Sequence, residues 1–186
     1  MIKFGNNYLL WISSFLIFLI DQITKIWALN TLNIDDEIVM NKIISFHRIF
    51  NDSYIMLNYN VYESSSWALD SQWKFRLIYG VFALILALGI VWVTNQPALK
   101  LKTWPAEFSK TGLFLIMGGI FGNVFDRTFR PDGVIDFIRI NIFEDTVPIV
   151  NVADAIIFLG EICLITAWLI VITQTITNKI KLINPK

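Results

Sequence analysis

Four long apolar segments constrain the fold of this chain more than any other feature. They cover about residues 8–29, 75–93, 111–129 and 152–173. A helix that crosses a bilayer needs about 20 predominantly apolar residues. Apolar side chains lie on all sides of these segments, which favours burial in lipid or in a helix bundle. We therefore expect an all-α membrane protein with four transmembrane helices in a single domain, residues 1–186.

The composition agrees with a membrane protein and excludes several kinds of site. Apolar residues make up 55% of the chain, against roughly 45–50% in soluble domains. The formal net charge is zero, so nothing points to a nucleic-acid partner. Cys163 and His47 are the only cysteine and the only histidine, which excludes disulfides within the chain, zinc clusters and histidine-based triads. We expect neither a metal ion nor an organic cofactor.

Basic residues predict the orientation of the segments, because cytoplasmic loops are enriched in lysine and arginine. Residues 95–110 and the C-terminal stretch carry lysines, with Glu107 as their only acidic neighbour. We therefore expect both termini on the cytoplasmic side. The first segment has no small-residue cleavage site, so we expect it to stay as an anchor. The tryptophans fit two membrane interfaces, with Trp27, Trp67 and Trp73 at the outer one and Trp11, Trp92 and Trp104 at the inner one.

Polar residues gather where this topology places the outer face. Asp21 and Lys25 lie four residues apart near the end of the first segment, so they share a helix face and can form an ion pair. Asn123, Asp126 and Arg127 close the third segment. Arg127 can serve as an interfacial anchor or as a counter-ion for Asp126. Several carboxylates on one side of a membrane protein indicate a functional site.

Three further polar residues follow in the chain. Asp136 lies in the loop after the third segment, and Asn151 and Asp154 open the fourth segment on one helix face. Taken alone, Asn151 and Asp154 can cap a helix and interact with its dipole. Gly119 and the glycines beside it can serve helix packing. These structural explanations lose weight when all the clusters are considered together.

Two chemistries remain open at this point. Two neighbouring carboxylates can share a proton, activate a water molecule and protonate the leaving amine of a peptide bond. They can equally carry a proton or a cation across the membrane, with Glu161 as a third carrier. Glu161 follows Asp154 by seven residues and lies on roughly the same helix face, about 10 Å deeper. We expect it to be a protonated or hydrogen-bonded residue within the bundle.

The chain resembles the lipoprotein signal peptidase (signal peptidase II) family over nearly its whole length. Four short motifs carry the resemblance: "DQITK" at 21–25, "GGIFGNVFDR" at 118–127, "GVIDFI" at 133–138 and "VNVADAIIFLG" at 150–160. Each motif is weak alone, but their order and their placement relative to four apolar segments make the combination specific. The resemblance implies four spans with a small extracytoplasmic β-sheet and an interfacial helix between the first two.

The resemblance also implies an activity and a site. The activity is aspartic endopeptidase cleavage of diacylglyceryl-modified prolipoproteins, just before the lipidated cysteine, in the bacterial inner membrane near its outer face. We expect a monomer that contacts membrane lipid and its prolipoprotein substrate. The family's catalytic dyad matches Asp136 and Asp154. Its polar and close-approach positions match Gly119, Asn123, Asp126, Arg127 and Asn151, and its first-helix motif matches Asp21 and Lys25, which we expect to be structural.

Two stretches depart from the family pattern. Residues 60–69, "NVYESSSWAL", replace an Asn-x-Gly-Ala-Ala-Phe-like segment that lies near the substrate in the family. The interval from Arg127 to Asp136 is about one residue longer than usual, which a loop can absorb. The first departure leaves room for a third hypothesis, a catalytically silent relative that binds lipidated peptides. The presence of both aspartates argues against that hypothesis.

Overall fold

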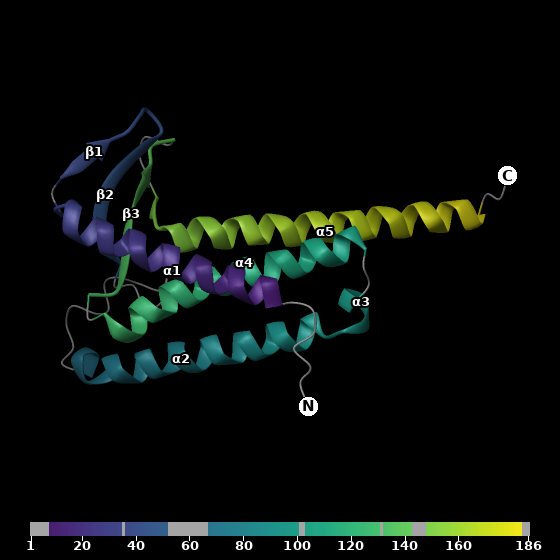
Figure 1. Cartoon of the computed structure of the whole chain (residues 1–186), viewed down its shortest axis with the longest axis horizontal. Coiled ribbons are helices and arrows are strands. Elements are labelled where there is room, and N and C mark those ends of the chain that lie inside the picture. The colour runs from purple at the N-terminus through teal and green to yellow at the C-terminus, as the bar shows by residue number, and fades with distance from the viewer. Residues whose placement is uncertain are drawn as a thin grey trace.

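The computed structural model describes residues 8–34, 36–51, 67–100, 103–130, 132–142 and 148–183. Its elements follow one another along the chain (Figure 1) as α1 Tyr8–Thr31, β1 Glu37–Val39, β2 Ile44–Asn51, α2 Trp67–Thr94, α3 Pro97–Lys100, α4 Trp104–Phe129, β3 Val134–Ile140, β4 Ile149–Val150 and α5 Val152–Ile183.

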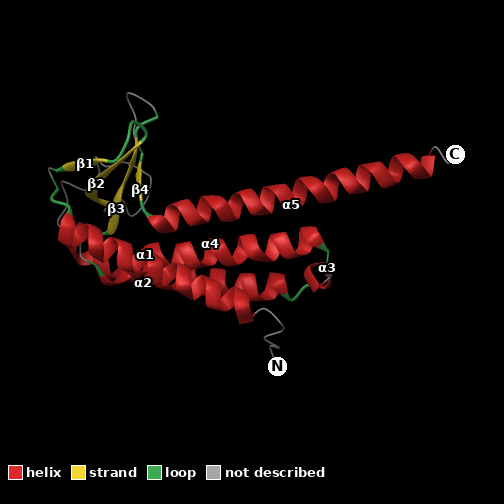
Figure 2. Ribbon diagram, turned by 45° about the horizontal axis from the view of Figure 1, so that its top comes forward, coloured by secondary structure: helices red, strands yellow, loops and turns green. Residues whose placement is uncertain are grey.

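The four long helices run side by side, and the sheet covers one end of them (Figures 1 and 2). Helix α4 packs against α1, α2 and α5, so it forms the centre of the bundle. Helix α1 ends and α5 begins next to the sheet, whereas α1 begins and α5 ends away from it (Figure 1). The start of α1 and the end of α5 therefore both lie at the ends of these helices that are away from the sheet.

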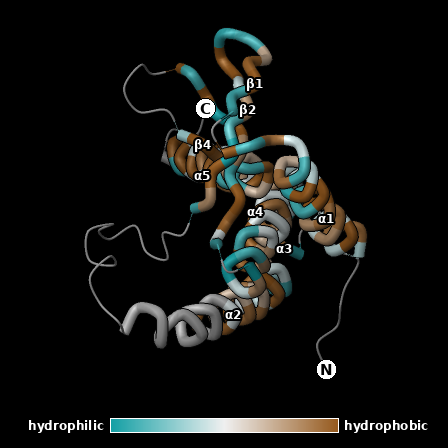
Figure 3. The backbone as a smooth tube through the Cα atoms, turned by 90° about the vertical axis from the view of Figure 1, so that its left-hand side faces the viewer, coloured by the Kyte–Doolittle hydropathy of each residue, from teal (hydrophilic) through white to brown (hydrophobic). Residues whose placement is uncertain are grey.

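Three of the described helices are long and apolar enough to cross a membrane, Tyr8–Thr31, Trp104–Phe129 and Val152–Ile180. Helix α2 contributes a shorter apolar stretch, Gly80–Thr94. Apolar residues dominate the described helices, while polar residues are more frequent in the sheet (Figure 3). The prediction of a mostly helical membrane protein with a small sheet is therefore confirmed in outline.

Two helices begin earlier than the apolar pattern predicted. Helix α2 begins at Trp67, and α4 begins at Trp104 with Pro105 in its first turn. Proline suits the first turn of a helix, because the N–H that it lacks would have no intrahelical partner there. The apolar pattern marks only the part of a helix that suits lipid, so it misses the polar turns at each end.

The sheet is antiparallel, with the order β1-β2-β3-β4. We expected it between the first two long helices, but only β1 and β2 lie there. Strands β3 and β4 come from the connection between α4 and α5, which brings Asp136 into the sheet. The interfacial helix predicted between α1 and α2 and residues 60–66 of the divergent segment lie outside the described residues.

A small apolar core fixes the sheet on the end of α1. Ala28 of α1 and Ile135 and Phe137 of β3 are fully or almost fully buried in it. The ring of Trp27 meets Phe46 and Phe137 edge to face, with centroids 5.4 and 6.0 Å apart. Aromatic pairs of this geometry add about 0.5–1.5 kcal/mol each beyond their buried area. This core holds β3 rigidly beside the helix ends.

Glycines let α4 and α5 approach closely. A Cβ atom at Gly112 would lie 2.7 Å from the carbonyl oxygen of Gly160, and a Cβ atom at Gly160 would lie 2.7 Å from that of Gly112. A Cβ atom at Gly119 would lie 2.6 Å from the carbonyl oxygen of Ala153. Small residues at such contacts are typical of helices that pack inside membranes. The close contact places the end of α4 against the start of α5.

Candidate active site

Lys25 forms the centre of a buried polar cluster between α1 and α4. Its side chain is fully buried, and its Nζ atom lies 2.8 Å from Oδ2 of Asp21 and 2.8 Å from Oδ2 of Asp126. It also donates a hydrogen bond of 2.9 Å to Oδ1 of Asn123. An ammonium group has three donors, and all three find an acceptor here. The predicted ion pair between Asp21 and Lys25 is confirmed.

Asp126 has a second cationic partner, Arg130. The Nε atom of Arg130 donates to Oδ1 of Asp126 at 2.8 Å, one helical turn along α4. The amide of Gln22 donates to the same oxygen at 3.2 Å. Together with Asp21 and Lys25, these residues form a group in which two carboxylates contact two cations. Paired charges avoid most of the cost that isolated buried charges would carry.

Asp21 connects this cluster to α5. Its Oδ1 atom accepts a hydrogen bond of 2.9 Å from the backbone N–H of Ala153. The first N–H groups of a helix have no partner within the helix, so this carboxylate satisfies one of them. Gly122 makes the contact sterically possible, because a Cβ atom there would collide with the carboxylate of Asp21.

Asn151 and Asp154 cap the start of α5 reciprocally. The backbone N–H of Asp154 donates to Oδ1 of Asn151 at 3.0 Å, and the backbone N–H of Asn151 donates to Oδ2 of Asp154 at 3.1 Å. This arrangement is equivalent to a capping box. It fixes the carboxylate of Asp154 over the helix N-terminus, where the helix dipole interacts favourably with negative charge.

Asp136 lies in strand β3, where its side chain is 2% exposed. We expected it in a loop, and that prediction is wrong. The residues on both sides of Asp136, Ile135 and Phe137, belong to the apolar core below the sheet. Their burial and the pairing of β3 with β2 impose an extended backbone. The carboxylate is therefore held by a strand and not by a flexible connection.

Two side-chain amides hold the carboxylate of Asp136. Asn151 donates to its Oδ1 atom at 2.6 Å, and Asn51 at the end of β2 donates to its Oδ2 atom at 3.0 Å. Asn123 connects this pair to the rest of the cluster. It donates to Oδ1 of Asp154 at 2.7 Å and accepts a hydrogen bond of 3.0 Å from Asn151. The amides thereby bring Asp136 and Asp154 into one hydrogen-bonded network.

Burial is the main cause that raises the pKa of Asp136, to about 6. The hydrogen bond from Asn51 lowers this pKa, the negative charge of Asp154 raises it, and Asn151 and Lys25 lower it further. A carboxyl group of this kind can hold a proton close to neutral pH beside a second carboxylate.

Within the described part of the chain, no group of three His, Cys, Asp or Glu side chains could hold a metal ion.

Most of the predicted site residues come together in this network. Gly119 faces α5 at close contact, so a helix and not open space meets it in this structure. Arg127 is partly buried in the last turn of α4. Glu161 is exposed on α5, so its prediction as a residue within the bundle is wrong. An outward position suits neither a buried hydrogen bond nor a proton path that starts from Asp154.

Three residues of the network were not singled out from the sequence: Gln22, Asn51 and Arg130. Arg130 follows Asp126 by four residues, and this spacing is typical of helical ion pairs, so it could have been found. Gln22 stands inside the "DQITK" motif but carries no charge to draw attention. Asn51 joins the site only through the pairing of β2 with β3, which no local pattern in the sequence indicates.

Comparisons with known proteins agree with this architecture. A lipoprotein signal peptidase of Wigglesworthia glossinidia brevipalpis is 34% identical over 159 residues, covering 86% of this chain and 93% of that protein. A lipoprotein signal peptidase of Trichormus variabilis is 29% identical over 164 residues, covering 88% and 91%. Two solved structures of bacterial membrane enzymes, 24% and 23% identical, share the fold with TM-scores of 0.62 and 0.63. They match 90% of this chain and 89% and 94% of the solved chains.

These likenesses and the apolar helices indicate a multi-pass membrane protein. The sequence also matches a protein-family model described as signal peptidase II, over residues 13–170 of this chain. Because that match covers most of the sequence, this chain belongs to the signal peptidase II family.

Proposed function

We propose that this protein removes the signal peptide from diacylglyceryl-modified prolipoproteins by cleaving the bond before the lipidated cysteine. Family membership supports the removal of signal peptides from lipoprotein precursors. The finer claim, a mechanism of the aspartic type, is supported by one observation above all. Asn151 holds Asp136 through its side chain and Asp154 through its backbone, so the two carboxylates share one rigid residue between them.

In the proposed mechanism the two aspartates act in different protonation states. Asp154 is the ionised base that takes a proton from a water molecule, and the water oxygen then attacks the scissile carbonyl carbon. Asp136 enters the reaction protonated, as its raised pKa favours, and donates its proton to the carbonyl oxygen as the carbonyl carbon becomes tetrahedral. When the carbon–nitrogen bond breaks, the leaving amine takes a proton from the pair. Two carboxylates whose environments differ can divide acid and base work in this way.

The remaining residues of the cluster position the dyad. Asn123 orients Asp154, while Asn51 and Asn151 orient Asp136. The group of Asp21, Lys25, Asp126 and Arg130 ties α1, α4 and the start of α5 together. Preorganised polar groups of this kind cost little reorganisation at the moment of reaction. We assign them positioning roles, with Arg127 as a further support residue near the substrate.

We further propose four membrane spans, with α2 as the fourth. Its apolar stretch Gly80–Thr94 and its packing against α4 support this assignment. The sheet and the dyad lie at one end of the bundle, and lysines such as Lys100 and Lys179 lie in elements that extend to the other end. Under the positive-inside rule, the active site lies near the outer face of the bacterial inner membrane and both termini lie in the cytoplasm. A monomer suffices for this activity.

The dyad is tested with Asp136→Asn and Asp154→Asn, and with Asp132→Asn as the matched control. Asp132 precedes the same strand but is exposed. Purified proteins in detergent are mixed with a diacylglyceryl-modified prolipoprotein, and the product is identified by mass spectrometry. We expect each dyad variant to lose on the order of 10²–10⁴-fold in rate, the usual range for an acid–base group, and Asp132→Asn to cleave like wild type.

The outcomes separate the parts of the proposal. Near-normal cleavage by either dyad variant would rule out the two-aspartate mechanism. No cleavage by a folded wild-type protein would rule out the substrate class and favour the hypothesis of a silent lipidated-peptide binder. Uptake of protons or cations into vesicles, abolished by Glu161→Gln, would instead support transport.

A further inference from the structure

Glu161 is an unpaired carboxyl group on a membrane helix. It is exposed on α5, and no hydrogen bond or ion pair joins it to any other residue that the structure describes. It is the only charged residue between Asp154 and Lys179 in the sequence. Acidic side chains within membrane helices are rare and usually pair with another polar group or face the interior of a bundle. Within the described part of one chain, Glu161 does neither.

The position of Glu161 along α5 places it inside the membrane. It follows Asp154 by seven residues, which correspond to about 10 Å along a helix. The candidate span runs from Val152 to Ile180, and the hydrocarbon core of a bilayer is about 30 Å thick. Long lysine and arginine side chains near a helix end can extend to the membrane interface, but a glutamate side chain is too short to do so from this depth. Glu161 therefore requires a hydrogen-bonding partner within the membrane.

Glu161 lies on the face of α5 that carries Asp154. Asp154, Phe158, Glu161 and Ile165 follow one another at spacings of four, three and four residues, which place them in one stripe along a helix. Phe158 and Ile165 are 64% and 57% exposed. The carboxylate of Asp154 stands at the upper end of the stripe, where Asn123 and the backbone of Asn151 hold it. We call these four positions of α5 the Asp154 stripe.

The signal peptide of a substrate has to approach this stripe. The scissile bond must reach the carboxylate of Asp154 for the proposed reaction to occur. A signal peptide carries an apolar segment of about 7–15 residues before its cleavage site, and this segment must continue from the dyad into the membrane. Because Asp154 projects from one face of α5, the peptide that descends from the scissile bond lies along the same face. Glu161 is the first polar side chain that it meets there.

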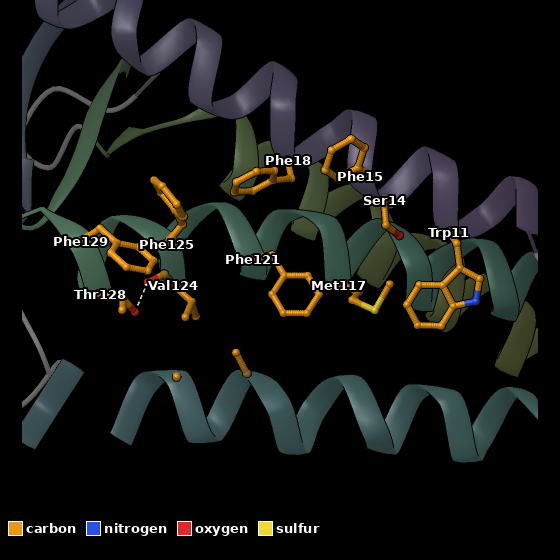
Figure 4. Close-up of a pocket in the computed structure, with 12 residues that line it drawn as sticks. Trp11, Ser14, Phe15, Phe18, Met117, Phe121, Val124, Phe125, Thr128 and Phe129 are labelled. Carbon is orange, nitrogen blue, oxygen red and sulfur yellow. Dashed lines mark hydrogen bonds between the residues drawn. The ribbon is translucent and has the colours of Figure 1, made fainter. Parts of the chain in front are cut away.

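A recess between α1, α2 and α4 does not provide an alternative path (Figure 4). On α4 it is lined by Met117, Phe121 and Val124, among other residues. Asn123, which holds Asp154, projects from a different face of α4, the one that meets α5. The described residues that line the recess include no aspartate or glutamate. A peptide in this recess would therefore lie on the wrong side of α4 for its scissile bond to reach the dyad.

The distance along the stripe determines which substrate residues can contact Glu161. An extended peptide covers the 10 Å between Asp154 and Glu161 with about three residues, at about 3.3 Å per residue. A helical peptide covers the same distance with about seven residues, at about 1.5 Å per residue. The contact therefore falls between the third and the seventh residue before the lipidated cysteine.

We propose that Glu161 is a specificity-determining residue, which accepts a hydrogen bond from a hydroxyl or amide side chain of the signal peptide in this interval. The inference rests on the proposed function. A carboxyl group can accept a hydrogen bond whether or not it is ionised. Lipid tails and apolar side chains offer no donor, so a signal peptide that is apolar throughout leaves Glu161 unsatisfied. A site with a buried polar group disfavours a ligand that lacks the matching group.

The preference is measured with a series of diacylglyceryl-modified prolipoproteins. Each carries either asparagine or leucine at one position between the third and the seventh residue before the cysteine. The proteins are wild type, Glu161→Leu and Glu161→Gln, with Thr173→Leu as the matched control. Thr173 is exposed on α5, a third of a turn away from Glu161, and its hydroxyl group already donates to the carbonyl oxygen of Leu169.

At one or two adjacent positions, wild type should favour the asparagine substrate more than Glu161→Leu does. The ratio of kcat/KM for asparagine over leucine should fall about three- to ten-fold in Glu161→Leu, the range for a hydrogen bond between membrane helices. Glu161→Gln keeps an acceptor oxygen and should retain the preference, as should Thr173→Leu. The difference should appear in KM more than in kcat, because the contact lies away from the scissile bond and is the same before and during the reaction.

The outcomes separate this inference from the proposed function. Cleavage by wild type and Glu161→Leu with equal ratios at every position would overturn the inference alone. A loss of the preference in Thr173→Leu as large as in Glu161→Leu would also overturn it, since any polar-to-apolar change on α5 would then suffice. Absence of cleavage of every substrate by folded wild type would overturn the proposed function, and this inference with it.

Photo-cross-linking provides a test that does not depend on turnover. A leucine analogue with a photoreactive diazirine replaces each residue of the interval in turn, and the substrate is bound to Asp154→Asn, which should leave it uncleaved. Mass spectrometry then maps the cross-linked residues. We expect labelling of Phe158, Glu161 or Ile165. Labelling confined to Met117 and Phe121 would place the signal peptide in the recess and overturn the proposal.

Discussion

The side-chain amide of Asn151 donates to Oδ1 of Asp136 at 2.6 Å. The residue that caps the start of α5 therefore also holds a carboxylate of β3. Because the same residue accepts the backbone N–H of Asp154, one asparagine sets the positions of both proposed catalytic groups. Stability of the helix start and geometry of the dyad are coupled through it, and this coupling can be measured.

Asn151→Ala should lower stability and activity together. Loss of a side-chain N-cap costs about 0.5–2 kcal/mol, and freeing Asp136 should reduce kcat at least ten-fold. Thr103→Ala is the control, because Thr103 stands at the N-cap of α4 without a side-chain capping bond, so both quantities should stay near wild type. Chemical unfolding in detergent and prolipoprotein cleavage provide the two measurements. An Asn151→Ala protein with normal kcat would separate the cap from the dyad.

Activity should fall as pH rises through the pKa of Asp136, which burial raises to about 6. The mechanism needs this group protonated, so kcat/KM should show an alkaline limb with an apparent pKa near that value, shared by the coupled pair. The hydrogen bond from Asn51 lowers the pKa of Asp136. Asn51→Ala should therefore move the limb to higher pH. A limb that stays in place would show that Asp136 is not the titrating acid.

Asp136→Asn should make the protein more stable at pH 8. The pKa of Asp136 is 3.8 in the unfolded reference and about 6 in the folded protein, so the folded state binds the proton more tightly. Stability of wild type then falls as pH rises from 4 to 6, by up to about 3 kcal/mol, and the asparagine variant avoids this loss. The free energies of unfolding of wild type and Asp136→Asn, measured at pH 4 and at pH 8, test this prediction. A difference between the two proteins that does not grow with pH would contradict the linkage.

Lys25→Ala should be strongly destabilising. It would leave Asp21 and Asp126 facing each other without the ammonium group that pairs both. Removal of one partner from a buried ion pair typically costs 3–5 kcal/mol. Arg139→Ala breaks the partly exposed pair with Glu37, and such pairs contribute about 0–1 kcal/mol. Equal losses for the two variants, measured by unfolding in detergent, would show that the burial of Lys25 is not important.

The sequence alone determined the helices and several of their local contacts. Apolar segments of sufficient length predict membrane helices, because a bilayer accepts few other structures. Helical spacing predicted the pairing of Asp21 with Lys25, and the order Asn151-x-x-Asp154 was compatible with a cap, which was considered only as an alternative. These features depend on residues within one turn of each other, so one segment contains all the information they need.

The tertiary structure decided how these segments combine. Asp136 belongs to a strand because β2, from a distant part of the chain, pairs with β3, and the same pairing brings in Asn51. Lys25 meets Asp126 because glycines let α4 approach α1 closely. Asn151 meets Asp136 because β4, which leads directly into α5, pairs with β3. Glu161 turned outward although its spacing from Asp154 suggested an inner face. Such contacts depend on the packing of whole helices against one another, which no local spacing contains.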